Sequence, residues 1–185
     1  KPDLRIALLV QDATDVLQDC GFEPFAGNVV KAVAASAFAG TRKQIDQMGT
    51  DVEVVSGQKM YWFRVDENGE IVGGIAKFIQ DRKEKVIEAL GLQNGDFVAL
   101  SAGSLRTAQK TAGVIRKAIG QKFEQYMQKD CYSFCWIVDF PMYEIGEESG
   151  ELEFCHNPFS MPQGGMEALE TVWNCLRERS VTTIR

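Results

Sequence analysis

The sequence contains one histidine, His156, which is followed by an amide and a proline, Asn157 and Pro158. An imidazole beside an amide can donate or accept hydrogen bonds with a small polar ligand, and the proline would rigidify the chain that follows. A single histidine next to a proline is nevertheless more often structural than ligand-binding. The residue types at this point therefore permit a binding site without requiring one.

Cysteines offer a second kind of chemistry, and there are five of them, at positions 20, 131, 135, 155 and 175. Cys131, Cys135, Cys155 and His156 match the spacing of a zinc site only in part, and Cys135 lies in an apolar run that is typical of a core. We therefore expect reduced thiols and no metal site. Reduced thiols, the lack of an apolar run of about 20 residues and a start without a secretory signal predict a cytoplasmic protein.

Other candidate sites have simpler explanations. Residues 102–104, Ala-Gly-Ser, stand between a predicted strand and a predicted helix, where backbone N–H groups can receive an anion. The glycine pattern of a phosphate-binding loop is missing, so Ser104 is expected to cap the helix. The carboxylates of residues 147–153 lie in an acidic loop that is expected to be exposed, so we expect them to be solvated and not to do acid–base work. We predict no catalytic residue in this chain.

Length and charge limit the class of protein. A chain of 185 residues with 45% hydrophobic content can form one domain, or one domain and part of another. The net charge is -6, and the basic residues are scattered along the sequence. A protein that grips nucleic acid over a broad surface needs clustered Lys and Arg, so we exclude that class and expect local contacts at most.

The first half of the chain carries clear signals for secondary structure. Residues 28–38 form a strand-like apolar run, and Thr41 with Gln44 makes a capping-box pair that predicts a helix ending at Gly49. The β-branched and aromatic residues of 52–55 and 60–65 predict strands. A hairpin should follow them, because Asn-Gly at 68–69 favours a tight turn.

The second half continues the alternation of helices and strands. Apolar residues recur at helical spacing from Phe78 to a stop at Gly91, and a strand is expected over residues 96–101. One or two helices should occupy residues 105–129, with Gly120 as the point of a break. A buried hairpin with its turn at residues 146–150 comes last. This order predicts an α+β fold with helices on one face of a mostly antiparallel sheet.

The hairpin segment carries a more specific signature. Residues 139–143 read Asp-Phe-Pro-Met-Tyr, and after the acidic loop residues 156–159 read His-Asn-Pro-Phe. The segment resembles bacterial-type aspartyl-tRNA synthetases, in which a strand ending in Asp-Phe-Pro-Met-aromatic leads through an acidic hairpin to a His-His or His-Asn pair before Pro-Phe. The similarity begins with Lys-Pro-Asp-Leu-Arg at residues 1–5 and extends to about residue 169.

This resemblance implies a division of the chain. Residues 1–26 would be the exit from a class II catalytic domain and a linker. Residues 27–128 would be the inserted GAD domain, a two-layer unit with helices on one face of its sheet. Residues 129–170 would return as strands of the catalytic sheet, whereas residues 171–185 do not align with the family and stay unassigned.

The resemblance also implies a function. Enzymes of this family activate L-aspartate with ATP and magnesium, transfer it to tRNA(Asp) and act as homodimers; the His-Asn form often accompanies charging of tRNA(Asn) as well. Carried over by position, His156 would contact the aspartate. The family's ATP-binding motifs are absent here, so we expect the chain alone to be inactive and to bind no cofactor. Two alternatives are a non-catalytic GAD module of a tRNA-dependent amidotransferase subunit, and an unrelated small enzyme using Cys155 or His156.

Two further expectations follow from the resemblance. Phe63 and Arg64 look like the Phe-Arg signature of class II synthetases, in which the arginine binds ATP. The turn at residues 68–69 follows at once and leaves no longer loop to reach the end of a tRNA. Arg64 is therefore expected to be an exposed strand residue. The hairpin of residues 134–154 would lie within a larger sheet in the whole enzyme. Without that sheet it should expose an edge and apolar surface, and the chain could self-associate there.

Overall fold

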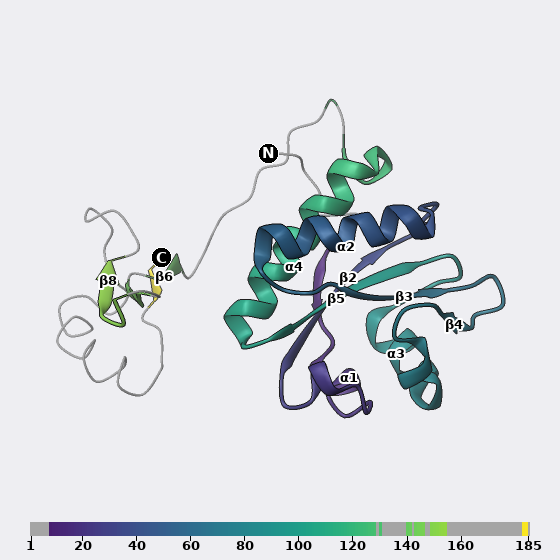
Figure 1. Ribbon diagram of the computed structural model, residues 1–185, viewed down its shortest axis with the longest axis horizontal. Helices are drawn as coiled ribbons and strands as arrows, with labels where there is room; N and C mark the ends of the chain where they lie inside the picture. The colour runs from purple at the N-terminus through teal and green to yellow at the C-terminus, as the bar shows by residue number, and fades with distance from the viewer. Residues whose placement is uncertain are drawn as a thin grey trace. The chain divides into compact units, whose positions relative to one another are not determined.

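The structure is a computed structural model that describes residues 8–128, 130, 140–141, 143–146, 149–154 and 183–184. Two compact units make up the chain, Lys1–Cys131 and Tyr132–Arg185 (Figure 1). The larger unit contains a five-stranded sheet with the order β1-β2-β5-β3-β4. Its strands are β1 (Val10–Asp12), β2 (Val29–Ala35), β3 (Tyr61–Val65), β4 (Ile71–Val72) and β5 (Phe97–Gly103).

All four pairings of this sheet are antiparallel. The longest is that of β2 with β5, which runs in register from Val29 opposite Gly103 to Ala35 opposite Phe97. Successive residues of β5 point to opposite faces. Val98 and Leu100 enter one hydrophobic cluster, and Phe97 and Ala99 enter the other. The predicted α+β class is thus confirmed.

Helices cover both faces of the sheet (Figure 1). The two longest, α2 (Arg42–Ser56) and α4 (Leu105–Lys122), lie on one face, as the sequence led us to expect. The opposite face is covered by α1 (Thr14–Leu17) and α3 (Lys83–Leu90). Four short 3-10 helices complete the unit, Glu23–Phe25, Ala76–Phe78, Gln80–Arg82 and Glu124–Tyr126. The expectation of helices on one face was therefore incomplete, because the central strands are apolar on both sides and must be buried on both.

Helix α2 begins as predicted and ends later. The Thr41 hydroxyl oxygen accepts a hydrogen bond from the backbone N–H of Gln44, and the side-chain oxygen of Gln44 accepts one from the backbone N–H of Thr41. The helix passes through Gly49 and stops at Gly57, which adopts the left-handed conformation with φ 69°. The strand expected over residues 52–55 is wrong, because Val52 lies one helical turn after the buried Met48 and joins the same core. Burial outweighs the β propensity of these valines.

The helix expected from Phe78 to Gly91 begins as an α-helix only at Lys83, after two 3-10 helices, and ends where predicted. Gly91 ends α3 in the left-handed conformation, and the Asn-Gly turn joins β3 to β4. Helix α4 is a single helix that continues through the buried Gly120. Among the residues that the structure describes, none of the helices has the combined length and apolar character of a membrane span.

Both ends of the larger unit are anchored to α4. Leu8 is fully buried in the cluster beneath this helix, and the Arg116 side chain donates a hydrogen bond to its carbonyl oxygen. At the other end, the 3-10 helix Glu124–Tyr126 follows α4 almost directly. Tyr126 packs into the same cluster and donates a hydrogen bond to the carbonyl oxygen of Ser36 at 2.7 Å.

The smaller unit contains two short sheets. Strand β6 (Phe140–Pro141) pairs with β9 (Thr183–Ile184), so the unassigned tail contributes a strand. Strands β7 (Tyr143–Ile145) and β8 (Leu152–Phe154) form the predicted hairpin. Gly146 and Gly150 are joined by a 3.0 Å backbone hydrogen bond across its turn. The hairpin prediction is confirmed for the described part of residues 143–154.

Two glycines with positive φ allow a matched test of the fold. Gly74 has φ +44°, and a Cβ there would collide with the carbonyl oxygen of Trp62. Gly57 has φ +69° and open space around it. Gly57→Ala should lower the free energy of unfolding by about 1–2 kcal/mol, the cost of the left-handed conformation alone. Gly74→Ala should cost several kcal/mol, because the backbone must also move.

Urea unfolding followed by far-UV circular dichroism measures both variants. Equal losses of stability in the two would contradict the close approach of Gly74 to Trp62.

Candidate functional site

The described strand that leads to His156 is one half of a hairpin with a hydrophobic face. In the β7–β8 register Tyr143 lies opposite Phe154, and Ile145 opposite Leu152. The rings of Tyr143 and Phe154 meet edge to face, with centroids 5.1 Å apart. All four side chains belong to one face because residues two apart on a strand point the same way. Ile145 is 49% exposed and Phe154 44% exposed, whereas Tyr143 and Leu152 are half-buried, so this face is partly uncovered.

The predicted site residue itself lies outside the described residues. Strand β8 ends at Phe154, two residues before His156, and Cys155, His156 and Asn157 are not among the residues that the structure describes. The role of His156 therefore stays a prediction. Cys131 and Cys135 also fall outside, whereas Cys20 is a buried free thiol. Within the described part of the chain, no three His, Cys, Asp or Glu side chains come together as metal ligands.

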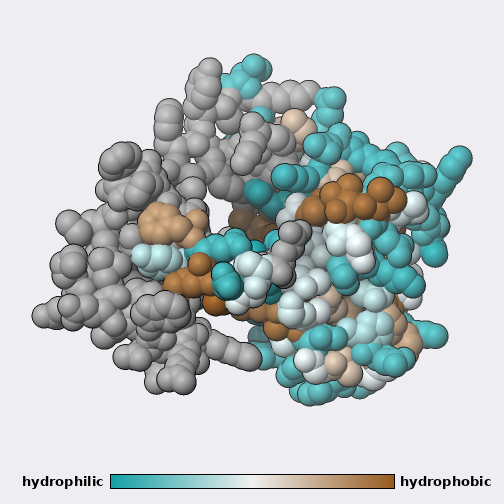
Figure 2. Space-filling model, turned by 60° about the vertical axis from the view of Figure 1, so that its left-hand side comes forward, coloured by the Kyte–Doolittle hydropathy of each residue, from teal (hydrophilic) through white to brown (hydrophobic). Residues whose placement is uncertain are grey.

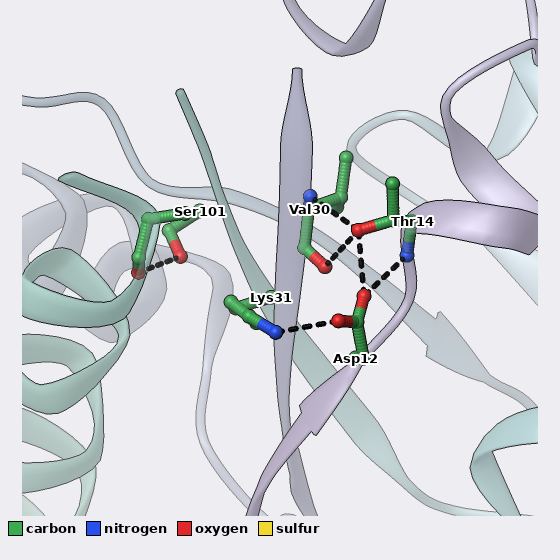
Figure 3. Close-up of polar contacts among 6 residues, drawn as sticks. Asp12, Thr14, Val30, Lys31 and Ser101 are labelled. Carbon is green, nitrogen blue, oxygen red and sulfur yellow. Dashed lines mark hydrogen bonds and ion pairs between the residues drawn. The ribbon is translucent and has the colours of Figure 1, made fainter. Parts of the chain in front are cut away.

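A compact polar cluster joins the start of α1 to the edge of the sheet (Figure 3). The Asp12 carboxylate accepts hydrogen bonds from the Thr14 hydroxyl at 2.6 Å, the Thr14 backbone N–H at 3.0 Å and the Lys31 ammonium at 2.6 Å. The Thr14 hydroxyl oxygen in turn accepts from the backbone N–H of Val30 at 3.0 Å. These bonds tie β1 to β2 and fix the first turn of α1. The polar atoms of Asp12, Thr14 and Lys31 bond to one another and to the backbone, so we interpret the cluster as structural. The sequence alone did not reveal it.

The cluster stabilises the ionised form of the Asp12 carboxyl group. The hydrogen bond from Lys31 is the largest cause, the bonds from Thr14 add to it, and the pKa falls from 3.8 to about 2. A carboxyl group with a lowered pKa in the folded state contributes stability above its unfolded pKa and loses it as the pH falls through the folded value. The Asp12 contribution is therefore present at neutral pH and disappears between about pH 4 and pH 2.

Asp12→Asn should lower the free energy of unfolding at pH 7 by at most about 1 kcal/mol, since the carboxylate is more than half exposed and screened by solvent. The difference between the native chain and the variant should shrink toward zero from pH 4 to pH 2. Denaturant unfolding at a series of pH values measures this difference. A difference that stays constant across the range would contradict the ion pair as its source.

Arg64 has a structural role that the sequence did not reveal. Its guanidinium group donates hydrogen bonds to the carbonyl oxygens of Phe38 at 2.6 Å and Gly40 at 3.3 Å, and it lies 5.4 Å from the centre of the Phe38 ring. The expectation that Arg64 is exposed is therefore wrong, since it is half-buried. The group that resembled a phosphate clamp is committed to the loop between β2 and α2.

Residues from two other places, the position before β5 and the 3-10 helix after α4, hold the same loop. Asp96, only 3% exposed, accepts a hydrogen bond from the backbone N–H of Ala37 at 3.3 Å. Gln125 donates to the carbonyl oxygen of Ala37, and Tyr126 donates to that of Ser36. Burial raises the pKa of the Tyr126 phenol, so this donor keeps its proton. These contacts hold Ala37 at φ 48°, a conformation that a residue other than glycine rarely adopts.

The strand-to-helix junction at Ser104 is a helix start, as expected. The Ser104 hydroxyl accepts a hydrogen bond from the backbone N–H of Thr107 at 3.3 Å and is paired with the Thr107 hydroxyl at 2.8 Å. Three residues earlier, the buried Ser101 donates to the carbonyl oxygen of Ala108 at 2.8 Å and ties β5 to α4 (Figure 3). The junction is thus built to start α4.

Arg64→Ala should lower the free energy of unfolding by about 2–3 kcal/mol, because it removes charge-assisted bonds to half-buried carbonyl groups. Arg42→Ala is a suitable control: Arg42 lies over Trp62 and pairs with Asp46, but its side chain is 68% exposed. It should cost no more than about 1 kcal/mol. Urea unfolding measures the stability of both variants. A loss of stability in Arg64→Ala no larger than that in Arg42→Ala would contradict the role of Arg64 in holding the loop between β2 and α2.

Comparisons with known proteins place this chain in a family. Residues 24–112, inside the larger unit, match the GAD domain. Over 92% of its length the chain is 42% identical to the aspartate–tRNA ligases of Streptomyces avermitilis and Streptomyces coelicolor. It is 37% identical over the same share to the aspartate–tRNA(Asp/Asn) ligase of Rickettsia felis. The chain spans about 29% of the length of each of these relatives. It belongs to the aspartate–tRNA ligase family, of which it represents a segment containing the GAD domain.

Proposed function

We propose that the full-length protein is an aspartate–tRNA ligase, which activates L-aspartate with ATP and transfers it to tRNA(Asp). The observation that carries the proposal is the extent of the similarity: it covers 92% of the chain and continues well beyond the GAD match of residues 24–112. A GAD module of an amidotransferase subunit would account only for the shared domain. Transfer to tRNA(Asn) as well is part of the proposal, since the Rickettsia felis relative is named for both tRNAs.

His156 is the residue of this chain that we propose to contact the aspartate. Strand β8 leads to it, and the exposed hydrophobic face of the β7–β8 hairpin supports the assignment of this unit to a larger sheet. In the full-length protein other strands would cover Tyr143, Ile145, Leu152 and Phe154. In the isolated chain that face could instead pair with another copy.

ATP and magnesium are assigned to parts of the protein outside this chain. The described residues bring together no metal-ligating group of three, and the two places that resembled phosphate sites are occupied otherwise. Ser104 caps α4, and Arg64 binds backbone carbonyl groups. The family's ATP-binding motifs are absent from the sequence, so we expect the chain alone to be inactive. We further propose a homodimer in the cytoplasm for the full-length protein.

Aspartate-dependent exchange of pyrophosphate into ATP tests the proposal on this chain and on a chain extended to the length of its relatives. Only the extended protein should exchange. His156→Ala in the extended protein should raise the KM for aspartate at least about tenfold, the value of one hydrogen bond to a charged group. Ser149→Ala, in the turn of the same hairpin, should leave exchange unchanged.

Charging assays with tRNA(Asp) and tRNA(Asn) then decide the acceptor. Exchange by the short chain would disprove our assignment of the ATP site. A folded extended protein without exchange would favour the non-catalytic module, and an unchanged KM in His156→Ala would remove the role of His156 alone.

A further inference from the structure

Helix α4 differs from the other long helices of the larger unit in its charge. It contains five basic residues and no acidic residue: Arg106, Lys110, Arg116, Lys117 and Lys122. A quarter of the basic residues of the chain thus lie in this one helix. The chain as a whole has a net charge of -6, so the residues outside α4 together carry -11.

Helices α2 and α3 show the usual mixture of signs. Two basic and three acidic residues stand on α2, and two of each kind stand on α3. Arg42 of α2 pairs with Asp46 four residues later. Such pairs stabilise a helix, so a solvated helix face usually carries both signs. Helix α4 can form no ion pair within itself, and an ordinary solvated face does not explain its composition.

Three of the basic residues stand on the same side of α4. Lys110 follows Arg106 by four residues and Lys117 follows Lys110 by seven, which are about one and two turns of helix. All three side chains are exposed, and we call them the basic ridge. At 1.5 Å per residue the ridge is about 16 Å long. Arg116 and Lys122 stand beside it and donate to backbone carbonyl oxygens.

The stability of the helix does not explain the ridge either. The dipole of a helix favours anions in the first turn and cations in the last turn. Arg106 is the second residue of α4, and the first turn contains no acidic residue to offset its charge. A positive charge therefore stands where the helix disfavours it, which points to a contact outside the helix.

A glycine lies in the middle of the ridge. Gly113 stands three residues after Lys110 and four before Lys117, on the same side of α4. A Cβ at this position would meet no atom within 4 Å, so the fold does not require a glycine there. Glycine is a poor helix former, but it lets a partner approach the backbone closely. The cations and the glycine together describe a contact surface.

The chemistry of this surface fits a polyanion. Most of the described surface in Figure 2 is hydrophilic, and the hydrophobic side chains gather in compact patches. A row of cations around a glycine has no apolar centre, whereas contacts between proteins usually have one. The phosphates of a nucleic acid recur along its strand, and rows of Lys and Arg neutralise them.

We propose that the exposed side of α4 binds the sugar–phosphate backbone of tRNA through Arg106, Lys110 and Lys117. This inference rests on the proposed function for the identity of the RNA, and it assigns to the larger unit a contact apart from that of His156 with aspartate. Phosphate contacts fix the position of a nucleic acid without reading its sequence. The acidic remainder of the chain repels RNA, so the ridge also directs the approach of the tRNA to α4.

Fluorescence anisotropy of a labelled tRNA(Asp) transcript tests the contact on this chain, in NaCl from about 20 to 200 mM. Three phosphate contacts should make the logarithm of the affinity fall with the logarithm of the salt concentration with a slope of about -2 to -3. Lys117→Ala should weaken binding and reduce the size of this slope by about 1. Lys85→Ala is the matched control, because Lys85 is exposed on α3 at the opposite face of the sheet and should leave binding unchanged.

A second pair of variants separates binding from stability. Gly113→Glu and Gly113→Gln both place a better helix former in open space, so the midpoint of urea unfolding should rise in both. The glutamate puts a carboxylate between Lys110 and Lys117, and it should weaken tRNA binding at least about tenfold. The glutamine has the same size without the charge, and it should retain most of the binding. A loss in the more stable protein cannot result from unfolding.

A chain that does not bind tRNA at the lowest salt concentration would overturn the proposal. So would equal losses in Lys85→Ala and Lys117→Ala, or native binding by Gly113→Glu. Binding to phosphatidylserine vesicles but not to tRNA would assign the ridge to a membrane surface instead. Pyrophosphate exchange involves no tRNA, so an extended protein that exchanges while this chain ignores tRNA would refute the ridge alone. Absence of exchange would refute the ligase without changing the binding measured here.

Discussion

The pairing of β2 with β5 is the constraint on which the rest of the larger unit depends. Its seven residue pairs place Val98 and Leu100 in one hydrophobic cluster, and Phe97 and Ala99 in the other. Each cluster then requires a cover of its own. Helices α2 and α4 supply one cover, and α1, α3 and the 3-10 segments supply the other. Ser101 adds a direct bond from the same strand to α4, so the strand fixes both the layers and the position of the longest helix.

The loop between β2 and α2 is the second point at which distant parts of the chain meet. Side chains from β3, from the residue preceding β5 and from the segment after α4 all end on its backbone. Backbone groups buried without partners would be costly, and here charged and phenolic side chains satisfy them. The loop can therefore bury Phe38, whose ring stacks on Phe97, and still keep the hydrogen bonds of its backbone.

The sequence was most informative where a local signal agreed with burial. The capping pair of Thr41 and Gln44, the turn at residues 68–69 and the stop at Gly91 all appear as predicted. It failed where tertiary packing overrode a local preference: Val52 belongs to a helix because its neighbours one turn away are buried. Arg64 was misjudged because its partners lie more than 20 residues away, and a single sequence does not show such contacts. The motif around His156 identified the family, while its geometry falls outside the described residues.

The two anchors on α4 have a consequence for how the GAD domain can be carried by a larger enzyme. Leu8 and Tyr126 lie near the points where the chain enters and leaves the larger unit, and both pack into the cluster beneath one continuous helix. Both segments are therefore held by the same cluster and by the second half of α4 or the residues that follow it. The position of these two segments thus depends on the core of the unit and not on its surface turns, so a change of length in a turn such as residues 66–70 would leave both segments where they are.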